Sequence, residues 1–238
     1  MVEVVAVNGS PDKAKGNTAR LLDNLLEGMH DAGANTKVLY ASEVKPRPCT
    51  GEMNCWYRTP GQCHVRDGMQ EAYPVLKEAE ILVLATPVYI PLPGDMQNFI
   101  NRMCPLFRPR LEFSQGRTRA KARDGVKLKG LVLVSTGAWW ELGNLDILVR
   151  IAEEMAMKMG LKYLGGVLRP HAFVMDGDQG KAQEVYQATR QAGRGLIIDG
   201  EFPKELLERI SRPLVSEEEL RARWNSLEEK VESHKEEK

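Results

Sequence analysis

The sequence lacks an apolar run that approaches the roughly 18 uninterrupted residues of a membrane span. It also lacks an excess of charge, because 33 basic side chains balance 33 acidic ones, so no global field favours nucleic acid or a membrane surface. The N-terminus has no basic segment or cleavage site before the apolar residues 2–7, and no internal repeat follows. These absences predict a cytoplasmic protein without nucleic-acid or membrane partners.

Cysteine is scarce, with only Cys49, Cys55, Cys63 and Cys104 in the chain. Thiols in the cytosol usually stay reduced, so three cysteines between residues 49 and 63 suggest metal or redox chemistry before they suggest disulfides. Cys104 lies beside an expected short helix and is interpreted as a packing residue. His171 follows an expected strand and is interpreted as a non-catalytic surface residue.

Short apolar runs alternate with helical patterns along the first 200 residues. Strands are expected at residues 2–7, 36–40, 81–85, 131–135 and 163–168. Helices are expected near residues 18–32, 69–79, 96–103, 142–159 and 181–194. This alternation predicts a parallel, doubly wound α/β sheet with strand order 2-1-3-4-5.

Two charged segments do not fit that alternation. Residues 105–129 show little periodicity and many basic groups, which predicts a solvated or intersubunit loop or, as a sharper alternative, an anion site for the phosphates of NAD(P)H. After Pro203 the chain becomes helical and charged, and acidic side chains dominate residues 216–238. We therefore expect a main domain over 1–200, a helical extension over 201–238, and a homodimer or higher oligomer joined through these complementary segments.

Three loops should meet at the carboxyl edge of the sheet, where open parallel sheets bind ligands. The loop over residues 9–18 offers hydroxyls, amides and a helix N-terminus, which together suit a phosphate. It matches neither a Walker A loop nor the dinucleotide Gly-x-Gly-x-x-Gly pattern, and an ordinary capped turn remains the alternative. The loop over 86–94 presents Tyr89, and the loop over 136–144 presents Gly137 and two adjacent tryptophans, of which at most one should face a ligand.

The motifs in these loops resemble those of the flavodoxin-like NAD(P)H-dependent FMN reductase superfamily, and within it the iron–sulfur flavoprotein group. The resemblance rests on residues 8–11 (Asn-Gly-Ser-Pro) with 16–18 (Gly-Asn-Thr), on 86–89 (Thr-Pro-Val-Tyr), and on the segment from Pro48 to Cys63. It implies that FMN is the cofactor and NAD(P)H the co-substrate. The implied FMN residues are Ser10, Lys15, Asn17, Thr18, Pro87, Val88, Tyr89, Thr136, Gly137 and Ala138.

The resemblance assigns these residues different parts of the flavin. Ser10, Asn17 and Thr18 would hold the phosphate, residues 87–89 would line the isoalloxazine ring, and Thr136 and Gly137 would approach its pyrimidine edge. Many relatives carry Arg where this chain has Asp12, so Lys13 or Lys15 would supply positive charge, or neutral donors would hold the phosphate. No catalytic acid or base is required, because the cofactor performs the redox step.

The cysteine segment departs from the group's four-cysteine pattern for a [4Fe–4S] cluster. Cys49, Cys55 and Cys63 match the first, third and fourth cysteines, but Glu52 occupies the second position. Because a cubane cluster normally needs four thiolates, we expect no iron–sulfur cluster. Zinc binding with His64 or Glu52 stays an alternative to three thiols that serve as small buried residues.

The sequence therefore predicts an FMN-dependent oxidoreductase that passes electrons from NAD(P)H to a small molecule, quinone-like or nitroaromatic, or to a redox protein. Two alternatives stay open: a non-enzymatic flavodoxin-like electron carrier, and a zinc-binding interaction module.

Overall fold

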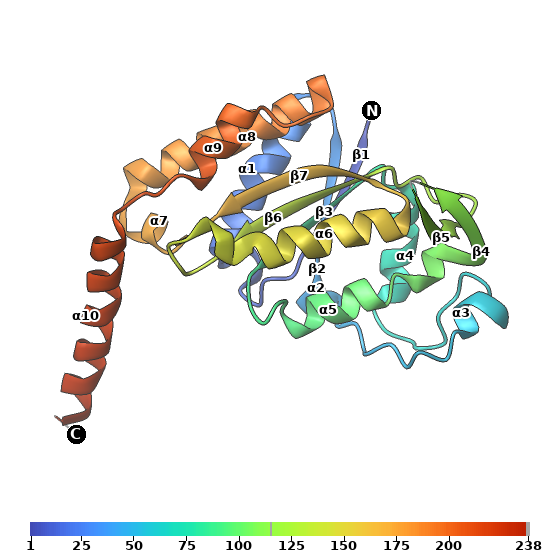
Figure 1. Ribbon diagram of the computed structural model, residues 1–238. Coiled ribbons are helices and arrows are strands. Elements are labelled where there is room, and N and C mark those ends of the chain that lie inside the picture. The colour runs from blue at the N-terminus through green and yellow to red at the C-terminus, as the bar shows by residue number, and fades with distance from the viewer. Residues whose placement is uncertain (115, 237–238) are drawn as a thin grey trace.

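A five-stranded parallel sheet forms the centre of the molecule (Figure 1), as the computed structural model of residues 1–114 and 116–236 shows. The strand order is β2-β1-β3-β6-β7, which confirms the predicted order. The strands are β1 (Glu3–Asn8), β2 (Asn35–Tyr40), β3 (Ile81–Pro87), β6 (Gly130–Thr136) and β7 (Lys162–Arg169). Because neighbouring strands run in the same direction, the chain must cross back over the sheet between them, and helices form most of these crossover connections.

Helices cover both faces of the sheet, because side chains along each central strand alternate between two cores. Val4 and Ala6 belong to one core and Val5 and Val7 to the other. The first core is covered by α1 (Asn17–Asp31) and α8 (Gln179–Asp199), and the second by α4 (Met69–Glu78), α5 (Gly94–Asn101) and α6 (Asp146–Met159). The sheet is therefore buried on both sides, as its continuous apolar strands require.

The crossing of α1 and α8 depends on glycine. A Cβ atom at Gly28 would lie 1.8 Å from the backbone oxygen of Arg190, and one at Gly193 would lie 2.2 Å from that of Leu25. The two backbones thus pack in direct contact. At the surface of the crossing, Arg190 of α8 pairs with Glu27 and Asp31 of α1, with N···O distances of 2.9 and 2.8 Å.

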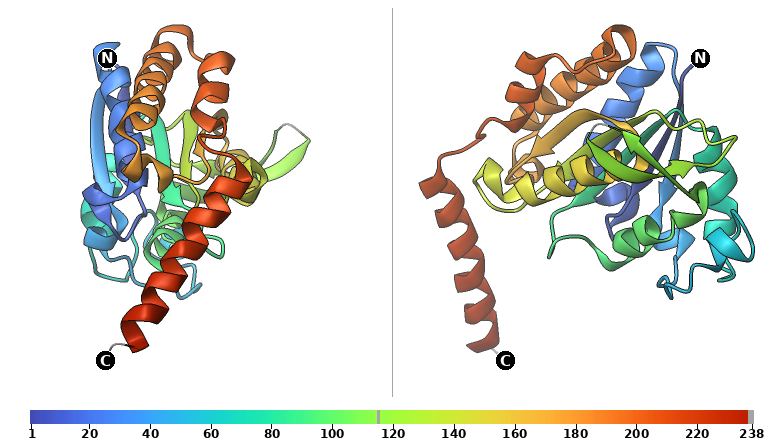
Figure 2. Two further views of the ribbon diagram at one scale, coloured as in Figure 1. Left: turned by 90° about the vertical axis from the view of Figure 1, so that its left-hand side faces the viewer. Right: turned by 45° about the vertical axis from the view of Figure 1, so that its right-hand side comes forward.

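The interpretation of residues 105–129 as an irregular loop is wrong for most of the segment. Strands β4 (Phe107–Ser114) and β5 (Arg117–Ala122) form an antiparallel hairpin, which projects from the body in Figure 2. Its pairing is interrupted by a register shift between Arg108 and Leu111. Shorter elements complete the main body: η1 (Lys13–Lys15), α2 (Ala41–Val44), α3 (Asn54–Tyr57), η2 (Cys104–Leu106), η3 (Leu142–Leu145) and α7 (Val174–Gly177).

The C-terminal residues form α9 (Lys204–Ser211) and α10 (Glu217–Glu236). Ile210, Leu214 and Leu220 are buried in the core that α1 and α8 cover, so this end of the chain packs on the main body. Beyond that contact α10 extends away from the sheet (Figures 1 and 2). Among the described residues, no helix combines the length and apolar character that a bilayer crossing needs.

A buried ion pair holds the cysteine-containing segment against α5. The guanidinium of Arg102 lies 2.7 Å from an oxygen of Asp67, and it donates further hydrogen bonds to the backbone oxygens of Arg47 and Val65. Both side chains are almost fully buried. Because removing one partner of such a pair leaves a buried charge uncompensated, this contact fixes the position of the segment over residues 47–67.

Candidate functional site

A crevice of about 280 Å³ opens at the carboxyl ends of β1, β3 and β6, where the strand order reverses. Nine of the ten residues expected at the site line it, and Lys15 does not. The expected residues that line it are Ser10, Asn17, Thr18, Pro87, Val88, Tyr89, Thr136, Gly137 and Ala138. Three loops that are far apart in the sequence therefore form one site, in the position typical of doubly wound sheets.

One end of the crevice is built on the N-terminus of α1. The helix begins at Asn17, and its capping residue, Gly16, has no side chain to accept the first N–H groups. A Cβ atom at Gly16 would lie 3.1 Å from the Ser10 hydroxyl, so glycine leaves that hydroxyl open to the crevice. Unpaired N–H groups and the helix dipole make this end suitable for an anion.

The polar side chains at this end are held by one another. The hydroxyls of Thr18 and Thr136 lie 2.6 Å apart, and both residues are buried. The amide of Asn17 donates to Asp176 across 3.0 Å. A network of this kind fixes the direction in which each donor points before a ligand arrives.

Positive charge lies outside the crevice. Lys13 pairs with Glu43 across 3.1 Å, and Lys15 is exposed. Asp12 lines the crevice, and its backbone N–H donates to the Ser10 hydroxyl. A phosphate placed here would therefore be held mainly by neutral hydroxyl and amide donors.

The other end of the crevice is lined mostly by apolar and aromatic residues. The N–H of Val88 donates to the backbone oxygen of Thr136 across 2.9 Å, which ties the second loop to the third. Tyr89 remains 54% exposed at the mouth. A Cβ atom at Gly137 would lie 3.2 Å from Leu145 and 3.4 Å from Val88, so a larger residue would disturb this wall.

Two aromatic residues that the sequence analysis missed also line the crevice. Phe173 follows β7, and Trp224 reaches the crevice from α10. Their rings meet edge to face with centroids 5.2 Å apart, and Trp224 lies 5.7 Å from Trp139. No local pattern around Trp224 indicated these contacts, because they join α10 to residues at least 50 positions earlier in the chain.

The interpretation of His171 as a surface residue is wrong, because its side chain is fully buried. The ring Nε2 accepts from the backbone N–H of Leu214 across 3.0 Å and lies 3.0 Å from the guanidinium of Arg169. The other ring nitrogen, Nδ1, lies 3.3 Å from the backbone oxygen of Trp140, to which it can donate. Burial and the nearby Arg169 charge lower the pKa of His171 to about 4, so the ring is neutral at neutral pH.

This buried group joins the C-terminal extension to the loop that lines the crevice. The Arg169 guanidinium donates to the backbone oxygens of Ile210 and Arg212. The backbone N–H of His171 donates to the oxygen of Trp139 across 2.8 Å, and the indole N–H of Trp140 donates to Val215 across 3.0 Å. Trp140 thus packs against the core, whereas Trp139 stays 56% exposed.

Cys104 lies closer to the other thiols than the sequence suggested. Burial raises the pKa of Cys55 to about 12, and the neighbouring Cys104 thiol adds to the rise. The indole N–H of Trp56 donates to the backbone oxygen of Cys104 across 3.0 Å, which joins the two segments. Within residues 1–114 and 116–236, no three side chains converge as a metal site would require.

Glu52, which occupies the position of the missing cysteine, is engaged in other contacts. Its carboxylate lies 2.8 Å from Nδ1 of His64 and accepts from the Thr50 hydroxyl. Cys55 and Cys63 are buried, whereas Cys49 is exposed.

The sheet order and the crevice at its switch point define the class of protein, a flavodoxin-like α/β protein with a crevice between three loops. The chain belongs to the family of NADPH-dependent FMN reductases, whose model matches residues 2–139. This is a family of oxidoreductases that use FMN and NAD(P)H.

Comparisons with single proteins agree with that family. The chain is 33% identical over 117 residues to an iron–sulfur flavoprotein of Archaeoglobus fulgidus, a match that covers 48% of this chain and 52% of that protein. The chain spans about half the length of the curated relatives it matches.

Solved structures share the fold at low sequence identity. A NAD(P)H:quinone oxidoreductase of Methanothermobacter marburgensis superposes with a TM-score of 0.60 at 15% identity, over 82% of this chain and 98% of that one. An FMN-dependent NADH-azoreductase of Bacillus anthracis, solved in complex with FMN, gives a TM-score of 0.58 at 14% identity, over 83% and 100% of the two chains.

Proposed function

We propose that this chain holds FMN in the crevice and oxidises NAD(P)H, with reduction of a small aromatic acceptor, quinone-like or nitroaromatic, or of a redox protein. The observation that carries the proposal is the crevice itself. It joins an uncapped helix N-terminus to a mostly apolar wall at the switch point of the sheet. Membership of the FMN reductase family supports the same cofactor.

The residues present fit the two parts of FMN. The phosphate would be held by Ser10, Asn17, Thr18 and the first N–H groups of α1. All of these are neutral hydrogen-bond donors that line or face the crevice. Residues 87–89 and 137–138 would line the ring. The exposed Lys15 would contribute only charge near the loop surface.

When bound, FMN supplies a carrier that accepts a hydride from NAD(P)H and passes electrons on. The chain orients the donors and keeps one wall of the crevice apolar. In the net reaction NAD(P)H loses a hydride and becomes NAD(P)⁺. A quinone acceptor gains two electrons and two protons, one of which comes from solvent.

The first prediction concerns the phosphate end. Protein reconstituted with FMN and desalted should retain about one flavin per chain, because the sheet has one switch-point crevice. The double change Asn17→Ala with Thr18→Val should weaken FMN at least ~10-fold, the equivalent of one hydrogen bond to a charged group. Equilibrium dialysis with FMN and riboflavin measures this.

Riboflavin is the internal control, because it lacks the phosphate and should bind almost equally to both proteins. Lys15→Ala should have the smaller effect on FMN. Equal losses of affinity for both flavins would contradict the phosphate assignment.

Steady-state oxidation of NAD(P)H with a soluble acceptor separates an enzyme from an electron carrier, which would need a partner reductase. Zinc in place of flavin in purified protein would indicate the interaction module.

A further inference from the structure

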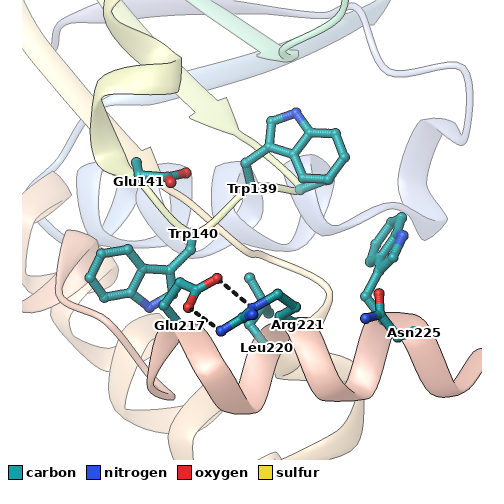
Figure 3. A pocket seen from close by; sticks show the side chains of 9 residues that line it. Trp139, Trp140, Glu141, Glu217, Leu220, Arg221 and Asn225 are labelled. Carbon is teal, nitrogen blue, oxygen red and sulfur yellow. Dashed lines mark hydrogen bonds and ion pairs between the residues drawn. The ribbon is translucent and has the colours of Figure 1, made fainter.

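A second cavity of about 370 Å³ adjoins the crevice and is closed on one side by α10 (Figure 3). Trp139 and Trp140 form its wall on the main body, and Leu220 lies on α10 opposite them. Its volume falls within the range of about 300–1,000 Å³ typical of small-molecule sites. Arg169, His171 and Trp140 all donate to or accept from the C-terminal extension and hold it against the loop that forms the cavity wall.

Two exposed indoles give this cavity its chemical character. Trp139 is 56% exposed and Trp224 is 43% exposed, and their ring planes meet at 50° with centroids 5.7 Å apart. Neighbouring exposed apolar faces that form a contiguous patch often mark a ligand-binding groove. Flat, electron-rich rings favour a planar aromatic ligand, which can stack on one and meet the other at its edge.

The charges at the rim disfavour an anionic ligand. Glu217 and Arg221 form a two-point ion pair, with both N···O distances 3.1 Å, so they neutralise each other (Figure 3). Glu141 adds an exposed negative charge to the lining, and its carboxylate accepts a hydrogen bond from the Asn144 amide across 3.0 Å. A nucleotide phosphate would be repelled here, whereas an uncharged ring would not.

The cavity shares Ala138 and Trp224 with the flavin crevice, so its occupant would lie next to the proposed ring wall. We propose that it binds a planar, uncharged aromatic electron acceptor, of which a quinone is the simplest. This inference rests on the proposed function and assigns its acceptor. The acceptor would take up two electrons and two protons, supplied by the hydride of NAD(P)H and one solvent proton.

Calorimetric titration with duroquinone tests this, because a fully substituted quinone does not alkylate thiols. Trp139→Ala and Trp224→Ala in the FMN-loaded protein should each raise its Kd about 10-fold, equivalent to ~1.4 kcal/mol. Ser226→Ala is the matched control on α10, since its hydroxyl donates to the backbone of Arg223 and does not line the cavity. An unchanged Kd in Trp139→Ala, or an equal rise in Ser226→Ala, would overturn the inference.

A second variant tests the charge argument. Glu141→Lys should lower the Kd of the anion anthraquinone-2-sulfonate and leave that of duroquinone unchanged. If NADPH affinity changes in the tryptophan variants while duroquinone affinity does not, the cavity is a nucleotide site and the inference fails.

Failure of the proposed function is separable from failure of this inference. Trp139 lines the second cavity but not the flavin crevice, so Trp139→Ala should retain FMN. Loss of FMN from the unmodified protein would refute the proposed function. Retained FMN with unaltered duroquinone binding would refute only the acceptor site.

Discussion

His171 shows how a single buried residue can carry the pH response of the fold. Its folded pKa is lowered to about 4, mainly by burial and then by Arg169, against about 6.5 for a free histidine. Arg169 and Arg212 are the charged groups of this cluster, and burial with the Arg212 charge lowers the pKa of Arg169 itself to about 10. Between about pH 4 and pH 6.5, the unfolded chain therefore binds a proton at His171 that the folded chain does not bind.

We expect the free energy of unfolding to decrease as the pH falls from about 6.5 to about 4, by ~3 kcal/mol from this group. Above about pH 6.5, where His171 is neutral in both states, this loss of unfolding free energy should be absent. His171→Gln should flatten this part of the profile, measured by urea denaturation at each pH. His30→Gln, at an exposed position of α1, controls for the loss of a histidine elsewhere. An unaltered slope in His171→Gln would show that another group dominates.

Glu52 is the residue that decides the cluster question. A carboxylate is a hard oxygen donor and a poor substitute for thiolate on cluster iron. Anaerobically purified protein should therefore contain no stoichiometric iron and show only flavin absorption bands. Glu52→Cys restores the group's four-cysteine pattern and should take up iron and sulfide on reconstitution.

Iron analysis and the visible spectrum measure both outcomes. About four irons per chain in the unmodified protein would contradict the prediction. Cys104, which neighbours Cys55, would then be the candidate fourth thiolate, and loss of the iron in Cys104→Ser would identify it.

At the scale of elements, the crossing of α1 and α8 limits the side chains that fit between them. Gly28→Ala would place a methyl group 1.8 Å from a backbone oxygen, so the helices must separate. The expected net loss is ~2 kcal/mol of unfolding free energy, because overpacking outweighs the helix propensity that alanine gains. Urea denaturation measures it.

Gly180→Ala, also in α8, is the matched control. Its new Cβ atom would meet only a side-chain oxygen of Asp178 at 3.5 Å, so stability should stay equal or rise slightly. Equal effects of the two changes would mean that the crossing tolerates a wider separation than the packing indicates.

At the scale of the whole molecule, the basic hairpin and the acidic α10 lie at opposite ends of the body (Figure 1). Because of this placement, a contact between the basic hairpin and the acidic α10 would have to form between two molecules. We predict at least a dimer by light scattering at micromolar concentration and moderate salt, weakening as salt screens the charges. Arg110→Glu in the hairpin should weaken it further, whereas Lys204→Glu, an equal change on α9, should not. A monomer at all concentrations would remove this role from both segments.

The sequence by itself determined the sheet and the position of the crevice. Continuous apolar runs identified β1, β3 and β6, which the structure buries on both faces, whereas β2 at the edge is only partly buried. Their alternation with helices fits the doubly wound order 2-1-3-4-5, and that order places the loops after β1, β3 and β6 together. Each of these signals is local, because periodicity and turn residues are properties of neighbouring positions.

Tertiary structure alone decided which distant residues share the site. The β4–β5 hairpin is stabilised by pairing between strands, and its many basic residues obscured the short alternation of basic residues with Thr or Ala over residues 117–122. The burial of His171 depends on Leu214, and the proximity of Cys104 to Cys55 depends on how η2 packs on α3. Trp224 lines the crevice because the C-terminal extension is anchored by hydrogen bonds from Arg169 and to His171 and by the burial of Leu220. Contacts of this kind join residues tens of positions apart, and no local pattern in one sequence encodes them.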